Sequence, residues 1–210
     1  MSIKLRKCCG SDVIDYNQLM SCLQTYKAPH RKITTLLQSG VLIRIKKGLY
    51  IFGDDFRQNT IHLGYLANLI YGPSYVSLEY ALSHYGMIPE RVETVTSITT
   101  KRNKTFQTPL AQFSYTYLNR KRFTVGIDWC PLDETTQHFF IASPEKALVD
   151  VIASQPDITN TDEMWTHLIE NLRIDETALS DLNFKRLKKI SDQYHKPVIT
   201  LLLKTLKRNS

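Results

Sequence analysis

Six side chains that can contact nucleic acid are predicted to share the exposed side of one short helix. After Pro29, the apolar residues Ile33, Leu36 and Leu37 recur at helical spacing and would be buried. The polar residues on the other side are His30, Arg31, Lys32, Thr34, Thr35 and Gln38. Hydroxyl, amide and guanidinium groups form hydrogen bonds with base edges, so this set suits contact with the major groove of DNA.

A second basic set follows directly in a predicted β-hairpin. Residues 41–46 and 49–52 are rich in β-branched and aromatic residues, and Lys47-Gly48 joins them. Arg44, Lys46 and Lys47 belong to this hairpin. Because lysine and arginine contact phosphates without reading sequence, we expect these three to meet the DNA backbone.

The elements that must position these residues follow in the order helix, turn, helix, hairpin. Asp15 can cap a first helix that carries an apolar stripe over residues 16–23. Pro29 suits the first turn of the second helix and Gly40 its end. This order is typical of a winged helix-turn-helix, whose second helix enters the major groove. We therefore predict such a domain at residues 1–56; the alternative is a small helical cap that binds nothing.

The charge of the chain is segregated. Residues 1–53 contain nine Lys/Arg and two Asp/Glu, residues 54–181 contain ten and seventeen, and residues 182–210 contain eight and one. The net charge of +7 therefore comes from two basic ends around an acidic middle. Such ends suggest contact with a polyanion, although a basic helix face is more often merely solvated.

The rest of the chain is predicted to be an α+β domain at residues 57–210, with a mostly antiparallel sheet and C-terminal helices. The alternation of Phe113, Tyr115 and Tyr117 with polar residues favours antiparallel strands with one wet face. Ser143 is a strong helix cap before Pro144. We expect helices at 59–70, at 78–85 capped by Ser77, and from 144 onward, and strands at 93–100, 111–118, 123–129 and 138–142.

The signatures of an enzyme are missing from the sequence. No Asp or Glu has lysine two positions later, as a metal-dependent nuclease of the PD-(D/E)xK kind requires. Asp54 and Asp55 are adjacent and would point to opposite faces of a strand, and no phosphate-binding glycine loop occurs. The four cysteines and six histidines show no zinc spacing, and we expect no function for Cys8 and Cys9. We expect no catalytic residue, metal or cofactor.

The chain has no apolar run of the roughly 18 to 20 residues that a membrane span needs, and its first residues lack the apolar stretch of a signal peptide. We therefore expect a cytoplasmic protein that does not enter a membrane.

Three stretches resemble a known family. They are Lys47-Gly-Leu-Tyr50, residues 76–90 (VSLEYALSHYGMIPE) and residues 142–150 (ASPEKALVD). Together they resemble the AbiEi-type antitoxins of type IV toxin–antitoxin systems, in order from about residue 15 to 155. Residues 160–210 match only in their helical, basic character. The two longer stretches are also typical of scaffold, because their periodic apolar positions favour packing.

This resemblance implies two partners and no catalytic residue. In the family, the winged N-terminal domain represses its own operon by binding repeats in the promoter, and the C-terminal domain neutralises a toxin with a nucleotidyltransferase fold. The implied partners here are double-stranded DNA with inverted repeats, bound as a monomer or a DNA-induced dimer, and a cognate toxin.

A third basic set is predicted on the C-terminal helices. Leu187, Ile190 and Tyr194 form an apolar stripe that avoids the neighbouring cations. These cations are Lys185, Arg186, Lys188 and Lys189. The interpretations left open are a solvated surface, additional phosphate contact, or a patch that holds an acidic toxin or occupies its nucleotide site.

Two other functions remain as alternatives. One is a stand-alone winged-helix regulator whose C-terminal domain senses a ligand or another protein. The other is a nucleic-acid-processing enzyme, for which metal-dependent cleavage of DNA or RNA would be the test.

Overall fold

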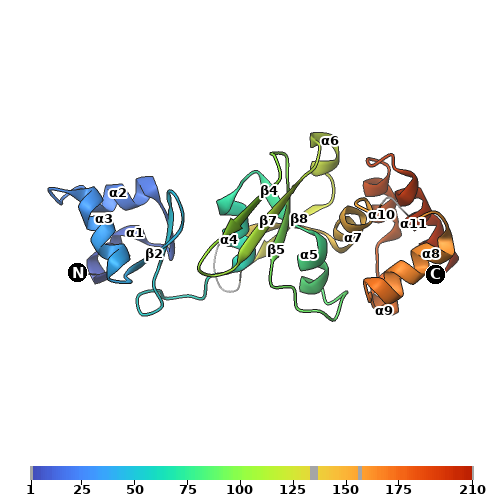
Figure 1. Ribbon diagram of the computed structural model, residues 1–210, viewed down its shortest axis with the longest axis horizontal. Coiled ribbons are helices and arrows are strands. Elements are labelled where there is room, and N and C mark those ends of the chain that lie inside the picture. Colours follow the sequence, from blue (N-terminus) through green and yellow to red (C-terminus); the bar gives the residue numbers. More distant parts are fainter. Residues whose placement is uncertain (1, 133–136, 156–157, 210) are drawn as a thin grey trace.

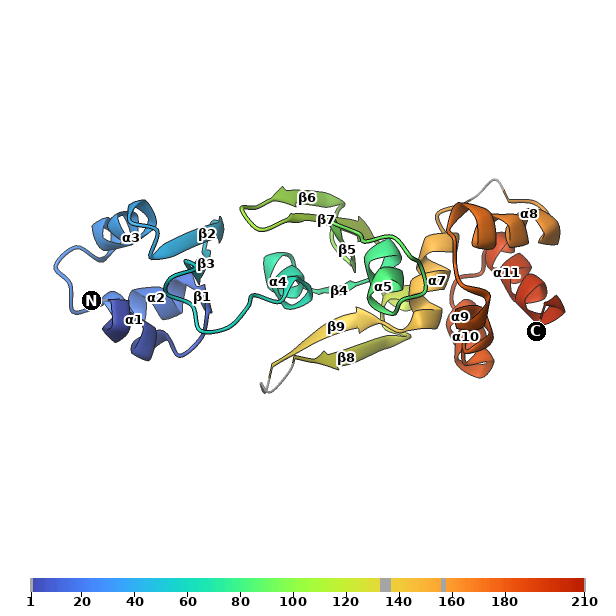
Figure 2. The same ribbon diagram turned by 90° about the horizontal axis from the view of Figure 1, so that it is seen from below.

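The computed structural model describes residues 2–132, 137–155 and 158–209, and its elements follow one another along a single long axis (Figures 1 and 2). A small α/β unit at the N-terminus lies at one end, a larger sheet lies in the middle, and the C-terminal helices lie at the other end. The predicted mixture of helices and strands is therefore confirmed at the level of an α+β fold.

The N-terminal unit combines three helices with a small antiparallel sheet of strand order β1-β3-β2. The predicted helices, turn and hairpin are all present, and a further helix and strand precede them. The elements are α1 (Ser2–Cys9), β1 (Val13–Asp15), α2 (Tyr16–Leu23), α3 (Pro29–Gln38), β2 (Leu42–Lys46) and β3 (Leu49–Phe52).

The helical stripes of this unit pack as their spacing predicts. Asp15 caps α2, because its Oδ1 accepts a hydrogen bond from the Gln18 backbone N at 2.9 Å. Leu19 of α2 and Ile33 and Leu36 of α3 are buried in one apolar cluster. This packing fixes α3 against the sheet and leaves its polar side outside.

The opposite side of the hairpin belongs to a different core. Ile45, Leu49 and Ile51 are buried in the same apolar cluster as Leu66 and Ile70 of the larger part of the chain. The hairpin is thus packed on both sides, which couples its position to that of the larger part.

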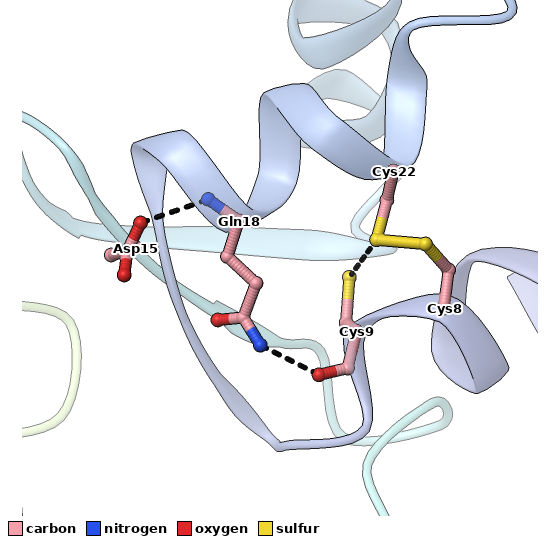
Figure 3. Close-up of a disulfide and its surroundings, with 5 residues drawn as sticks. All are labelled: Cys8, Cys9, Asp15, Gln18 and Cys22. Carbon is pink, nitrogen blue, oxygen red and sulfur yellow. Dashed lines mark hydrogen bonds between the residues drawn. A yellow bond between two sulfur atoms is a disulfide. The ribbon is translucent and has the colours of Figure 1, made fainter.

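A disulfide joins Cys8 of α1 to Cys22 of α2, with Cα atoms 5.7 Å apart (Figure 3). The buried thiol of Cys9 lies 3.6 Å from the Cys22 Sγ, and Gln18 Nε2 donates to the Cys9 backbone oxygen at 2.7 Å. Our expectation that Cys8 has no role is wrong, because this bond ties α1 to α2. Closing a loop of this length stabilises a fold by about 3 kcal/mol in the chain-entropy model.

The larger sheet has the strand order β6-β7-β5-β4-β9-β8. Its strands are β4 (Ser74–Val76), β5 (Val95–Thr99), β6 (Lys104–Gln107), β7 (Gln112–Tyr117), β8 (Ile127–Pro131) and β9 (His138–Ala142). Three neighbouring pairs are antiparallel, but β5 with β7 and β4 with β9 are parallel. The sheet is therefore mixed, whereas the small N-terminal sheet is wholly antiparallel.

Two expected boundaries are wrong for local reasons. The helix expected at 59–70 is α4 (Leu63–Ile70), because the Asn59 backbone N and side chain instead bind Asp12 of the N-terminal unit. The strand expected at 123–129 is β8, which starts at Ile127, because Asn119 caps a short helix before it. That short helix is α6 (Arg120–Phe123).

Ser77 precedes α5 (Leu78–His84) as expected, but it does not cap the helix. Its Oγ donates to Asp150 Oδ2 at 2.7 Å instead. Ser143 does act as expected, because its Oγ accepts from the Lys146 backbone N at the start of α7 (Pro144–Ile152).

The remaining helices form the C-terminal end of the molecule. They are α8 (Thr161–Thr166), a π-helix η1 (His167–Asn171), α9 (Glu176–Ser180), α10 (Phe184–Ser191) and α11 (Pro197–Arg208). Within the described ranges, no helix combines the length and apolar character that crossing a membrane requires.

Gly126 is a glycine at which a side chain would meet both backbone strain and close side-chain neighbours. It has φ +82°, and a Cβ there would lie 2.7 Å from Ile190 Cδ1 and 2.9 Å from Lys146 Cβ. Gly86 also has positive φ, +67°, but a Cβ there meets nothing within 4 Å. We expect Gly126→Ala to destabilise the fold by about 1–3 kcal/mol more than Gly86→Ala, because overpacking adds to the backbone strain that both share. Urea denaturation measures the free energy of unfolding of both variants, and an equal decrease for the two would contradict this prediction.

Candidate nucleic-acid interface

Helix α3 presents most of its predicted contact residues to solvent. Pro29 at its first turn and Gly40, with φ +70°, after its end set its limits. The exposed side chains are His30, Arg31, Thr34, Thr35 and Gln38. No acidic residue occurs between Asp15 and Asp54, so nothing in this stretch of chain neutralises the exposed face.

Local contacts order part of this face. Thr34 Oγ1 donates to the His30 carbonyl at 3.3 Å, and Thr35 Oγ1 donates to the Arg31 carbonyl at 3.1 Å. The imidazole of His30 stacks with Tyr16 of α2, with centroids 6.3 Å apart. The two threonine hydroxyls keep their lone pairs for a further partner.

Lys32 lies apart from the other five residues. Its Nζ is 5.5 Å from the centroid of the Tyr26 ring, in the turn between α2 and α3, and its side chain is half-buried. A cation over an aromatic ring is held there by the ring quadrupole. The Lys32 side chain thus contacts the α2–α3 turn, whereas the other five residues form the exposed face of α3.

The hairpin displays two of its three predicted cations. Arg44 is exposed on β2 and Lys47 is exposed in the turn. Lys46 is half-buried, and its Nζ donates to the Ile70 carbonyl at the end of α4. The register of β2 on β3 shifts between Arg44 and Lys46, and such a bulge re-aims the side chain next to it. The structure therefore places Lys46 away from the other two residues.

The environment of Lys46 also differs from that of a surface lysine. Burial lowers the pKa of its ammonium group, and the nearby cations of Lys101 and Lys104 lower it further. These two residues come from the larger part of the chain. Lys46 therefore connects the hairpin to a second basic region.

The third basic set is smaller than the sequence indicates. Arg186 Nη2 donates to Asp128 Oδ1 at 2.5 Å, and its Nε lies 3.8 Å from Glu145 Oε2. The hydrogen bond to Asp128 raises the pKa of Arg186. Our expectation that Arg186 belongs to a free basic face is therefore wrong, because this side chain ties α10 to β8 and α7.

The other three cations of α10 are exposed. Lys188 Nζ is 3.4 Å from Asp192 Oδ2, whereas Lys185 and Lys189 point to solvent. Helices α3 and α10 lie at opposite ends of the molecule in both views (Figures 1 and 2). The two basic sets are thus separate surfaces.

A buried polar cluster that we did not predict from the sequence consists of Tyr75, Ser77, Lys146, Asp150 and Tyr194. Lys146 Nζ lies 3.2 Å from Asp150 Oδ1, with 0% and 1% of the side chains exposed. Burial lowers the pKa of Lys146, and the Asp150 carboxylate opposes this shift. Burial, followed by the Asp150 charge, raises the pKa of Tyr75 and of Tyr194.

Every one of the five side chains in this cluster is buried. It joins β4 and α7 to the C-terminal helices and acts as scaffold. A signal was present in the sequence: Lys146 and Asp150 stand four residues apart on a helix whose other positions are mainly apolar. Among the described residues, no group of three or more His, Cys, Asp or Glu side chains could hold a metal ion.

Comparisons with known proteins bear on the fold alone. No family model matches the chain, and no curated protein matches it. A solved structure that is similar is the crystal structure of the RV2827C protein from Mycobacterium tuberculosis. The TM-score is 0.58 at 14% sequence identity, and the match covers 94% of this chain and 73% of that one. The likeness therefore extends over nearly all of the elements described above.

Proposed function

We propose that this protein is a sequence-specific DNA-binding transcriptional repressor. In this proposal residues 1–56 form a winged helix-turn-helix, in which α3 is the recognition helix and the β2–β3 hairpin is the wing. The observation that carries it is the exposed face of α3, which combines hydroxyl, amide and guanidinium groups beside Arg44 and Lys47 and has no acidic residue in the same stretch of chain. A rigid helix with such a face matches the chemistry of base edges in the major groove.

The biological role that we propose follows from the family resemblance. The protein would repress its own promoter by binding inverted repeats as a monomer or a DNA-induced dimer. It would also act as the antitoxin of a type IV system, with residues 57–210 countering a toxin of the nucleotidyltransferase class. A neighbouring gene for such an enzyme, whose expression arrests growth only in the absence of this protein, would support this role. If growth arrest is unchanged when this protein is expressed together with the enzyme, the proposed antitoxin role is refuted.

Fluorescence anisotropy tests the DNA-binding proposal. The purified full chain is titrated onto the duplex from just upstream of its own gene, with a shuffled duplex of equal length as competitor. We expect a preference of about 10³ or more for the native duplex at near-physiological salt. Equal and steeply salt-dependent binding to both duplexes would contradict sequence-specific recognition.

The wing should contribute affinity without specificity. Replacing Arg44 and Lys47 together by alanine is expected to weaken binding to native and shuffled duplexes alike. The magnitude of the slope of log binding constant against log salt concentration should decrease by about two, because two phosphate contacts are lost. The control variant removes Lys185 and Lys189, two exposed cations of α10, and should leave the slope unchanged. A slope that responds equally to both variants would contradict the assignment of the wing.

A further inference from the structure

A basic turn lies within the part of the sequence that is acidic on average. Lys101 and Arg102, which follow β5, and Lys104, the first residue of β6, are all exposed. We call these three residues the β5–β6 basic turn. No acidic residue occurs between Glu93 and Asp128, so the negative balance of residues 54–181 arises outside this segment.

The backbone of this turn is held in place. The Asn103 Oδ1 accepts a hydrogen bond from the Tyr117 backbone N at 2.7 Å. The Lys101 backbone N donates to Thr99 Oγ1 at 3.2 Å, and this hydroxyl donates to the Pro73 carbonyl at 2.8 Å. The turn therefore presents its cations on a fixed frame, which reduces the entropy lost when they bind a partner.

Aromatic side chains lie next to the two lysines of this turn. The Nζ of Lys101 lies 5.2 Å from the centroid of the Tyr71 ring, and that of Lys104 lies 4.9 Å from the centroid of Phe106. Tyr117 is 54% exposed beside them. Tyr71, Lys101 and Tyr117 line a pocket of about 840 Å³ together with Thr100, Arg102 and Asn103, whereas Lys104 and Phe106 lie outside its lining. Each ring attracts the ammonium group next to it and so holds that lysine at the surface.

The cations of the turn are not balanced by carboxylates. Within the described ranges, none of the three forms an ion pair with an Asp or Glu side chain. Lys101 and Lys104 are instead close enough to Lys46 to lower its pKa. A polyanion bound here would remove this like-charge repulsion, which strengthens its binding.

We propose that the β5–β6 basic turn binds the phosphate backbone of duplex DNA flanking the site that α3 reads. This inference rests on the proposed function, since α3 must first place the DNA. Duplex DNA is the occupant that the geometry favours, because the turn adjoins the wing. Lys46 of the wing reaches the Ile70 carbonyl, next to Tyr71 of the pocket, and Ile45 shares the core of the larger part.

The test uses the full chain and duplexes of two lengths. The short duplex of about 14 bp contains the selected site alone, and the long duplex adds about 10 bp, one helical turn, at each end. The variant is Lys101→Ala/Arg102→Ala/Lys104→Ala. The control is Lys185→Ala/Lys188→Ala/Lys189→Ala, which removes the same number of exposed cations from α10. Arg102→Ala alone, an exposed position, provides a second variant if the triple variant folds poorly.

The turn variant should bind the long duplex at least about tenfold more weakly than the wild type does, with a salt slope reduced by about two to three. Arg102→Ala alone should reduce the slope by about one. Neither variant should change binding to the short duplex. The α10 control should change binding to neither the short nor the long duplex. Unchanged binding to the long duplex, or the same loss on both lengths, would overturn the proposal. A loss confined to an RNA hairpin of equal length would also overturn it.

The result also separates this proposal from the proposed function. If the wild type binds native and shuffled DNA equally, the proposed function fails. The salt slope on a long shuffled duplex then still tests the turn. A reduced slope in the turn variant supports phosphate contact, and an unchanged slope overturns it.

Discussion

Replacing Asp150 by alanine is expected to lower the free energy of unfolding by about 3–5 kcal/mol, because a buried ion pair loses one partner. The Asp150 carboxylate accepts hydrogen bonds from Tyr75 OH at 3.0 Å, from Ser77 Oγ at 2.7 Å and from Tyr194 OH. Without it, the Lys146 ammonium keeps the Arg122 carbonyl at 2.8 Å but has no counter-charge. Urea denaturation followed by circular dichroism measures the loss.

Two controls make this prediction specific. Asp192→Ala removes the carboxylate of an exposed pair with Lys188, whose side chains are 57% and 65% exposed, and should cost less than about 1 kcal/mol. The double variant Lys146→Met/Asp150→Leu removes both buried charges and should be more stable than Asp150→Ala alone. Equal losses for Asp150→Ala and Asp192→Ala would show that the buried cluster does not hold the C-terminal helices in place.

Replacing Thr34 and Gln38 together by alanine is expected to reduce the preference for the native duplex by about 10- to 100-fold. Each side-chain contact with a base edge contributes about 1–3 kcal/mol of discrimination, and a hydroxyl falls at the lower end of this range. Both residues are uncharged and exposed, so neither the phosphate contacts nor the fold should change. The measurement is the ratio of anisotropy affinities for native and shuffled duplexes.

The wing variant supplies the matched comparison for this prediction. Arg44→Ala/Lys47→Ala should lower the salt slope and leave the preference intact, whereas Thr34→Ala/Gln38→Ala should do the opposite. The same response from both variants would contradict the division between base contact by α3 and backbone contact by the wing.

Local signals in the sequence were sufficient to predict the helices and the hairpin of the N-terminal unit. The stripe of α2, the cap at Asp15 and the limits of α3 depend on residues close in the chain, and the structure confirms them. The cap at Ser143 also depends on residues close in the chain, and the structure confirms it. In contrast, Ser77 has an equally good local signal, but its hydroxyl binds a carboxylate 73 residues away.

The errors at the candidate site also arise from contacts between residues that are distant in sequence. Lys46 and Lys47 are neighbours in sequence, yet the bulge in β2 turns only Lys46 towards the Ile70 carbonyl. Arg186 fits an exposed helix face by its spacing, but Asp128 and Glu145 come to it from other elements. Whether a cation is exposed depends on partners that are distant in sequence. The periodicity of a helix or strand carries no information about those partners.

The β5–β6 basic turn could not be predicted from the net charge of the segment that contains it. The sum over residues 54–181 is negative, and the β5–β6 basic turn becomes visible only when the strands bring its cations beside Tyr71 and Lys46. Parallel pairing of β5 with β7 is what places Tyr117 next to Thr99 and hence beside this turn.

The most direct test of the central claim, that α3 reads DNA sequence, is selection from a random duplex library with the full chain, followed by sequencing. We expect one enriched motif for the wild type and for the α10 control Lys185→Ala/Lys189→Ala. We expect Thr34→Ala/Gln38→Ala to degrade this motif at specific positions. A motif that survives the α3 substitutions unchanged, or a wild-type library with no enrichment, would contradict this claim.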